Sequence, residues 1–335
     1  ELRLGRGWLA YLLYDFYGPI TIADLQTLKD PMAEKILPRL SEEEMQTYIE
    51  TELTEASKIL PANYKKGDKN YGRFTAGLAH TVLLKLYMLT KQWDKAAAEG
   101  RELMKPESGF ELVREYKDIF TLANEKNPEI IWACQCAKGY QEHKWQPHVL
   151  PNDYNFTPYL DKMTKWNGYK ISWSFMHTFD PEDKRLLTIA SEYTSKDGVV
   201  HNEKNDSQDP SAQLYLGAVP LKYEFDPDCT GEDSQIDWII YRYADVLTLT
   251  AEAIVRNKNA VTKEAVDLLN EVRTRSLPGK GYSLQDLNSV DKFLKAVLDE
   301  RGWELYFEGN RRQDLIRYGI FVETIKKKAQ SMGKQ

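Results

Sequence analysis

The chain has 335 residues, of which 42% are apolar and 29% are charged. These fractions are close to the averages of globular proteins, and they exclude a disordered tail, a collagen-like repeat and a disulfide-rich miniprotein. Lys and Arg number 45 against 51 Asp and Glu, so the net charge is −6, without the positive charge typical of nucleic-acid binders. The aromatic content of 12%, with 8 Trp and 20 Tyr, is high. Aromatic side chains can fill a core or form stacking surfaces.

The first 17 residues are predicted to form a helix, because apolar side chains recur at intervals of four: Leu4, Trp8, Leu12 and Phe16. A helix that begins without a cap at the first residue leads us to expect a further segment upstream in the native protein. No apolar run reaches about 18 residues, so no membrane-spanning helix is predicted. The three cysteines, Cys134, Cys136 and Cys229, are interpreted as small apolar residues.

Helical hairpins are predicted near both ends of the chain. Ser41 followed by Glu44 forms a capping box, which starts a helix that runs to about residue 60. Helices over residues 73–89 and 93–104 carry small residues where they face each other, as in a tetratricopeptide unit. A second pair is predicted over residues 241–255 and 262–275.

The periodicity fades between residues 109 and 238. Residues 127–135 (NPEIIWACQ) read as a strand, and Trp173 alternates with Phe175 on what we expect to be another. The rest is rich in Gly, Pro, Asn and Asp and too aromatic for a disordered segment. A long loop of this kind in a compact protein is typically functional.

Sequence motifs for catalysis, metals and cofactors are absent, since the chain has no HExxH, GxSxG or P-loop and its five histidines have no metal-ligand spacing. Glu300, Glu304 and Glu308 share a helical face, and we expect ion pairs with the nearby Arg301, Arg311 and Arg312 rather than acid–base work on a glycoside. Residues 226–237 are similar to an EF-hand calcium loop. However, position twelve is Asp where the EF-hand has Glu, and no helix precedes the segment, so a solvated acidic turn is favoured.

Residues 299–319, DERGWELYFEGNRRQDLIRYG, resemble the C-terminal signature of the SusD/RagB-like family, ER-x-x-E-L-x-F-E-G-x-R-x-x-D-L-x-R-x-G. Every fixed position of that form is met, while Arg312 stands where many members carry an aromatic residue. Further stretches are similar in the family's order: GRFT at 72–75, NPEIIW at 127–132, RYADVL at 242–247 with AEA at 251–253, and NEVRTR at 270–275.

The resemblance implies a mainly α fold, in which a tetratricopeptide-like helical scaffold (residues 1–108 and 239–335) carries an irregular region (109–238) with a few short strands, all within one domain over residues 1–335. It implies a cell-surface lipoprotein that faces outward from the outer membrane. Such a protein binds an oligosaccharide or polysaccharide and passes it to a SusC-like TonB-dependent transporter. The lipid anchor belongs to an N-terminal part outside this chain. The resemblance also implies no enzyme and no cofactor, and the signature residues themselves are expected to be structural.

Sugar recognition needs flat apolar platforms for pyranose rings and planar polar groups for their hydroxyls. The segment from residue 140 to 173 supplies both, although its aromatics could equally pack the loop onto the scaffold. His143 and His148 lie in the same loop and could add a polar contact. The predicted ligand-binding residues are Trp145, Tyr154, Tyr159, Trp166 and Tyr169, with Asn152, Asp153 and Asn167.

Three alternatives to oligosaccharide delivery remain open. The first is a peptide-binding member of the same family. A structural scaffold for the transporter would use the aromatic loop as an interface and have no ligand of its own. A glycan-cleaving enzyme is the least favoured, because the sequence shows no matching catalytic arrangement.

Overall fold

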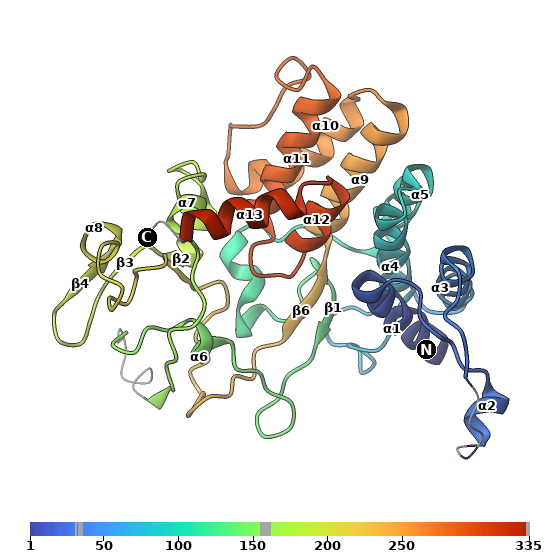
Figure 1. Cartoon of the computed structure of the whole chain (residues 1–335), viewed down its shortest axis with the longest axis horizontal. Helices are drawn as coiled ribbons and strands as arrows, with labels where there is room; N and C mark the ends of the chain where they lie inside the picture. Colours follow the sequence, from blue (N-terminus) through green and yellow to red (C-terminus); the bar gives the residue numbers. More distant parts are fainter. Residues whose placement is uncertain (31, 33–35, 155–161, 333–335) are drawn as a thin grey trace.

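The computed structural model describes residues 1–30, 32, 36–154 and 162–332. The fold is mainly α: Figure 1 shows the longer helices stacked on one side of the molecule and the long central segment, with its short helices and strands, on the other. Within the described residues, no helix is long and apolar enough to span a membrane.

The N-terminal helices begin largely where the capping residues place them. Their bounds are α1 (Leu2–Tyr17), α2 (Leu25–Lys29), α3 (Glu42–Ser57), α4 (Ala76–Leu89) and α5 (Trp93–Leu103). The capping box of Ser41 and Glu44 is confirmed, with both side chain–backbone hydrogen bonds present. Helix α4 begins three residues later than predicted, because the Thr75 side chain accepts a hydrogen bond from the Leu78 amide and caps the helix there.

The C-terminal helices extend the same stack. They are α9 (Tyr243–Lys258), α10 (Lys263–Ser276), α11 (Val290–Glu304), α12 (Arg311–Arg317) and α13 (Phe321–Met332). Helix α5 packs directly on α9, so the two predicted hairpins, far apart in sequence, lie side by side. Gly100 permits this approach, because a Cβ atom there would lie only 1.9 Å from Oγ1 of Thr250.

The central segment consists of short elements joined by loops. Its α-helices and strands are β1 (Ile130–Cys134), α6 (Trp145–Val149), α7 (Trp173–Met176), β2 (Ile189–Ala190), β3 (Glu192–Thr194), β4 (Val200–Asn202), α8 (Glu203–Asp206), β5 (Val219–Pro220) and β6 (Trp238–Arg242). Its 3₁₀ turns, with one more at Pro106–Ser108, are Tyr116–Phe120, Leu122–Asn124 and Lys184–Thr188. The strand expected at Trp173 is wrong, since that residue begins a helical turn and its indole Nε1 donates to the Leu214 carbonyl.

A two-stranded antiparallel sheet of β1 and β6 lies between two hydrophobic cores. Ile131 and Tyr241 belong to the core of the helical stack, whereas Ile130 and Ile239 belong to the core of the central segment. Ile130 and Ile131 are successive residues and point to opposite faces of the strand, while the β1–β6 register is irregular on either side of Trp132. The sheet therefore joins the helical stack to the central segment.

A buried ionic network fixes the same junction. The Glu304 carboxylate on α11 accepts hydrogen bonds from Arg185 at 3.2 Å, from Arg242 at 2.5 Å and from Arg275. Burial by itself would raise the pKa of Glu304, but its three arginine partners hold that pKa below its ordinary value. The sequence correctly indicated structural ion pairs, but the expected partners are wrong. Arg301 instead pairs with Asp245 and Asp314, and Arg312 with Asp15.

We predict that Glu304→Gln lowers the free energy of unfolding by about 3–5 kcal/mol, because it removes one partner from a buried network and leaves the arginine charges uncompensated. Urea denaturation followed by circular dichroism measures the change. The control is Glu264→Gln, which removes an exposed pair with Arg101 and should cost less than about 1 kcal/mol. Equal losses for the two variants would contradict the central role of the network.

A half-buried carboxylate, Glu125, lies beside Asp237, whose amide donates to Glu125 Oε1 at 2.8 Å. Burial raises the pKa of Glu125 to about 7 from its ordinary 4.5. Because the pKa is higher in the folded than in the unfolded state, the protonated Glu125 carboxyl favours the folded state. Its contribution to the free energy of unfolding is complete below pH 4.5 and is lost as the pH rises through 7. We predict that Glu125→Gln, which mimics the protonated acid, flattens the fall in stability between pH 5 and 8. Thermal unfolding across that range measures it, and the exposed Glu102→Gln should keep the wild-type profile.

Candidate functional site

Residues 166–170 are held against helix α6 by backbone hydrogen bonds. The amide of Trp166 donates to the Pro147 carbonyl at 2.7 Å, and the amides of Gly168 and Tyr169 both donate to the His148 carbonyl at 2.8 Å. Asn167, between them, adopts a left-handed conformation with φ 55°. The tight turn brings the predicted platforms Trp166 and Tyr169 to the same short helix.

These contacts create an exposed aromatic surface, here called the aromatic patch: Trp166, His148 and Tyr169. The rings of His148 and Tyr169 stack with centroids 4.9 Å apart, and Trp166 meets His148 edge-on at 4.7 Å. Trp166 remains 39% exposed and Tyr169 47% exposed. The patch therefore presents ring surface to solvent in a fixed geometry.

Two other predicted platforms face the interior. Trp145 is only 7% exposed, and its ring packs against Trp238 at 5.5 Å and Phe307 at 5.4 Å. Tyr154 is buried and packs against Tyr193. Trp145 and Tyr154 therefore do not form open stacking surfaces, because both rings are enclosed in the hydrophobic core of the central segment, here called the second core.

A polar pocket of about 530 Å³ lies near the patch, lined in part by Asp153, His201 and Asp206. The two ring nitrogens of His201 lie 2.9 Å from Asp153 Oδ2 and 2.8 Å from Asp206 Oδ2. Asp153 also accepts a hydrogen bond from the Tyr193 hydroxyl at 2.6 Å. Burial, with this bond to Asp153, raises the pKa of Tyr193 well above its usual range.

Gln213 connects the polar pocket with the aromatic patch. Its side-chain oxygen accepts from the Asn152 amide at 3.3 Å, and its backbone carbonyl accepts from Asn167 Nδ2 at 3.3 Å. Three of the predicted polar residues, Asn152, Asp153 and Asn167, therefore come together around one glutamine that the sequence did not single out.

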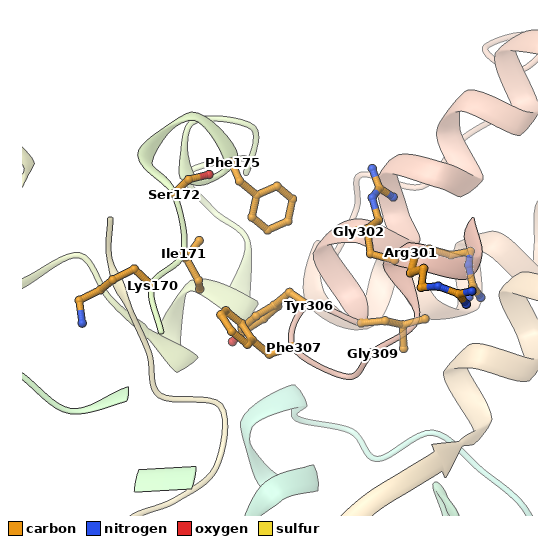
Figure 2. Close-up of a pocket in the computed structure, with 12 residues that line it drawn as sticks. Lys170, Ile171, Ser172, Phe175, Arg301, Gly302, Tyr306, Phe307 and Gly309 are labelled. Atoms are coloured by element: carbon orange, nitrogen blue, oxygen red, sulfur yellow. The ribbon is translucent and has the colours of Figure 1, made fainter. Parts of the chain in front are cut away.

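A third feature is a cavity of about 480 Å³ between residues 170–175 and the turn that follows α11. Figure 2 shows the rings of Phe175 and Phe307 at its wall and the Lys170 side chain turned away from them. Phe307 has a left-handed φ of 57° and lies 6.1 Å from Tyr169 between ring centroids. The cavity thus adjoins the aromatic patch, because Phe307 in its wall contacts Tyr169 of the patch.

Three further sequence predictions have other outcomes. Tyr159 lies outside the described residues. His143 is largely buried, with Nε2 at 2.8 Å from the Ile236 carbonyl, and burial lowers its pKa. In the acidic loop at 226–237, Asp226 accepts from the backbone amides of Asp228 and Gln235. Across the described part of the chain, no group of three or more His, Cys, Asp or Glu residues is placed to hold a metal ion.

The comparisons with known proteins agree with this fold. Residues 222–335 match the model of the SusD family. SusD-like protein P25 of Formosa agariphila is 25% identical over 329 residues, which cover 87% of this chain and 58% of that protein. A SusD homolog from Bacteroides thetaiotaomicron superimposes with a TM-score of 0.80 at 24% identity, over 100% of this chain and 70% of that structure.

The C-terminal third of the chain thus matches the SusD family, and SusD-like proteins are similar to the chain over most of its length. Another relative, the starch-binding protein SusD of Bacteroides thetaiotaomicron, is 24% identical over 337 residues, 83% of this chain and 57% of that protein. Surface glycan-binding protein A from Bacteroides uniformis shares the fold, with a TM-score of 0.70 at 22% identity over 94% of this chain and 65% of that structure. The chain spans about three fifths of the length of these curated relatives.

We predict stability losses of very different size for two tryptophans of the loop. Trp145→Ala should lower the free energy of unfolding by about 3–5 kcal/mol, because it leaves a cavity in the second core. Trp166→Ala should change it by no more than about 1 kcal/mol, since the ring is partly exposed. Urea titrations of both variants measure this difference, and a strongly destabilised Trp166→Ala would contradict the assignment of this ring to an open surface.

Proposed function

We propose that this chain binds oligosaccharides at the cell surface and delivers them to a SusC-like TonB-dependent transporter of the outer membrane. Similarity to the SusD family supports this proposal, as do relatives named for binding starch or surface glycans. The proposed location is the outward-facing side of the outer membrane, through an N-terminal lipid anchor. The division into a scaffold over residues 1–108 and 239–335 and a ligand-binding region over 109–238 is part of the proposal.

The observation that carries the proposal is the aromatic patch beside the polar pocket. The C–H face of a pyranose ring stacks on exposed Trp and Tyr rings, while its hydroxyls need carboxylate, amide and imidazole partners. Trp166 and Tyr169 supply the ring surface, and Asn152, Asp153 and Asn167 lie within the adjoining polar network. The arrangement suits a sugar chain of more than one residue.

Binding fits this site better than catalysis. Both nitrogens of His201 are engaged by carboxylates, so neither is left to activate a nucleophile. Glu300 and Glu304 are buried in ion pairs with arginines and have no access to a ligand. We therefore infer a protein that captures its ligand without cleaving it.

We predict that the double variant Trp166→Ala/Tyr169→Ala weakens oligosaccharide binding by about tenfold or more, because it removes two stacking rings. Affinity gel electrophoresis against a panel of polysaccharides identifies the ligand, and calorimetry with its oligosaccharide gives the dissociation constant. Tyr140→Ala is the matched control, since Tyr140 is 93% exposed and outside the patch. Unchanged binding by the double variant would reject the patch as the binding surface.

The transporter partnership requires a separate experiment. The tagged protein, expressed from its own gene, should co-purify from solubilised outer membranes with the TonB-dependent transporter encoded beside that gene. Co-purification without binding to any glycan would favour a structural scaffold, and binding to peptides in place of glycans would favour a peptide-binding member of the family.

A further inference from the structure

The cavity beside the aromatic patch contains arginines in two different electrostatic states. Arg301 is buried and paired with Asp245 and Asp314 at 2.7 and 2.9 Å. Arg312 is paired with Asp15 at 2.9 Å. Arg311, between them in the same wall, donates one hydrogen bond from Nη1 to the Leu298 carbonyl at 2.7 Å. It makes no ion pair with any described residue.

Lys170, at the opposite wall of the cavity, likewise makes no ion pair with a described residue. Its ammonium group donates to Oδ1 of Asn167, and no carboxylate in the described ranges lies within 4 Å of it. Figure 2 shows that the Lys170 nitrogen points away from Phe175 and Ile171, and its bond to Asn167 places it on the side of the aromatic patch. Both residues thus line the cavity, and the Lys170 ammonium group lies on the side of the aromatic patch.

These two cations differ from the buried cations of the fold. Arg185, Arg242 and Lys222 are buried, and each contacts at least one carboxylate, because burying a cation without an opposite charge costs free energy. Arg311 is exposed and Lys170 is half-buried, so both can remain charged at the cavity wall without a protein carboxylate. Partial burial lowers the pKa of Lys170 to about 8. Cations placed in this way are available to pair with an anionic ligand.

We propose that this cavity binds the anionic group of an acidic glycan, either the carboxylate of a uronic acid or a sulfate ester. The inference rests on the proposed function, because the sugar chain that carries the charge lies across the aromatic patch. Arg311 faces the anionic group inside the cavity, and Lys170 meets a second charge at the edge of the patch. The guanidinium plane has the donor geometry that suits carboxylate and sulfate oxygens.

The shape of the cavity supports a sugar ring with one charged substituent. Phe175 and Phe307 give it apolar walls, and its volume of about 480 Å³ lies in the range of small-molecule sites. Gly302 leaves the space in front of Arg311 open. A Cβ atom there would lie 3.4 Å from Arg311 Nη1 and 3.7 Å from Phe175 Cε2.

We predict that the 335-residue chain binds acidic oligosaccharides more tightly than neutral ones of equal length. Calorimetry would compare oligogalacturonate, a sulfated carrageenan oligosaccharide and cello-oligosaccharide. Arg311→Gln should weaken binding of the preferred acidic ligand about tenfold or more, with no change for the neutral one, because it removes a charge-assisted contact. Lys170→Gln should act in the same direction, and higher salt should reduce the preference.

Two further variants test whether a lost preference for the acidic ligand comes from the cavity itself and not from a disturbed fold. Gly302→Leu fills the cavity and leaves every charge in place, so it should also remove the preference for the acidic ligand. Arg101→Gln removes an exposed charge that pairs with Glu264 outside the cavity, and it should leave the preference unchanged. Thermal unfolding of each variant confirms that the fold is kept.

The outcomes separate this inference from the proposed function. Equal affinity for acidic and neutral ligands, or full acidic preference in Arg311→Gln and Gly302→Leu, would overturn the anionic site while leaving glycan binding intact. Loss of both ligands in the Trp166→Ala/Tyr169→Ala variant, with loss of only the acidic preference in Arg311→Gln, supports both. A chain that binds none of the polysaccharides in the panel fails the proposed function, and the anionic site fails with it.

Discussion

The buried ion network around Glu304 is the interaction on which the rest of the structure depends. It joins α11 to strand β6 through Arg242, to α10 through Arg275 and to the central segment through Arg185. Charges buried in this way stabilise a fold only when each has its partners in place. The network therefore ties one arrangement of helices to one arrangement of the central loops.

Two cations outside this network have no carboxylate partner among the described residues. Arg311 is exposed and Lys170 is half-buried, so neither requires a buried counter-charge. Both border the cavity that adjoins the aromatic patch. A fold that is rigid at its junction can hold such uncompensated groups open to a ligand, since the free energy for keeping them in place comes from contacts elsewhere.

Much of the helical scaffold could be predicted from the sequence. Helix periodicity and caps are local properties, so Ser41 located the start of α3 and the small residues indicated the hairpins. The exposure of side chains in the loop over residues 140–173 could not be predicted in the same way. Trp145 and Trp166 occur in similarly polar stretches, yet one is enclosed by the second core and the other faces solvent. That difference arises from Trp238 and Phe307, which are distant in sequence, and no local pattern contains it.

The sequence by itself determined the family resemblance, the mainly α class and the segment in which a ligand face was to be expected. It determined these because helix periodicity, capping and signature motifs depend on residues that are close together in the sequence. Only the tertiary structure decided which carboxylate pairs with which arginine, which aromatic rings remain exposed and which cations stay unpaired. Burial and charge balance depend on segments that lie from tens of residues to more than a hundred residues apart, as Arg275 and Arg185 do from Glu304, and such contacts leave no local pattern in the chain.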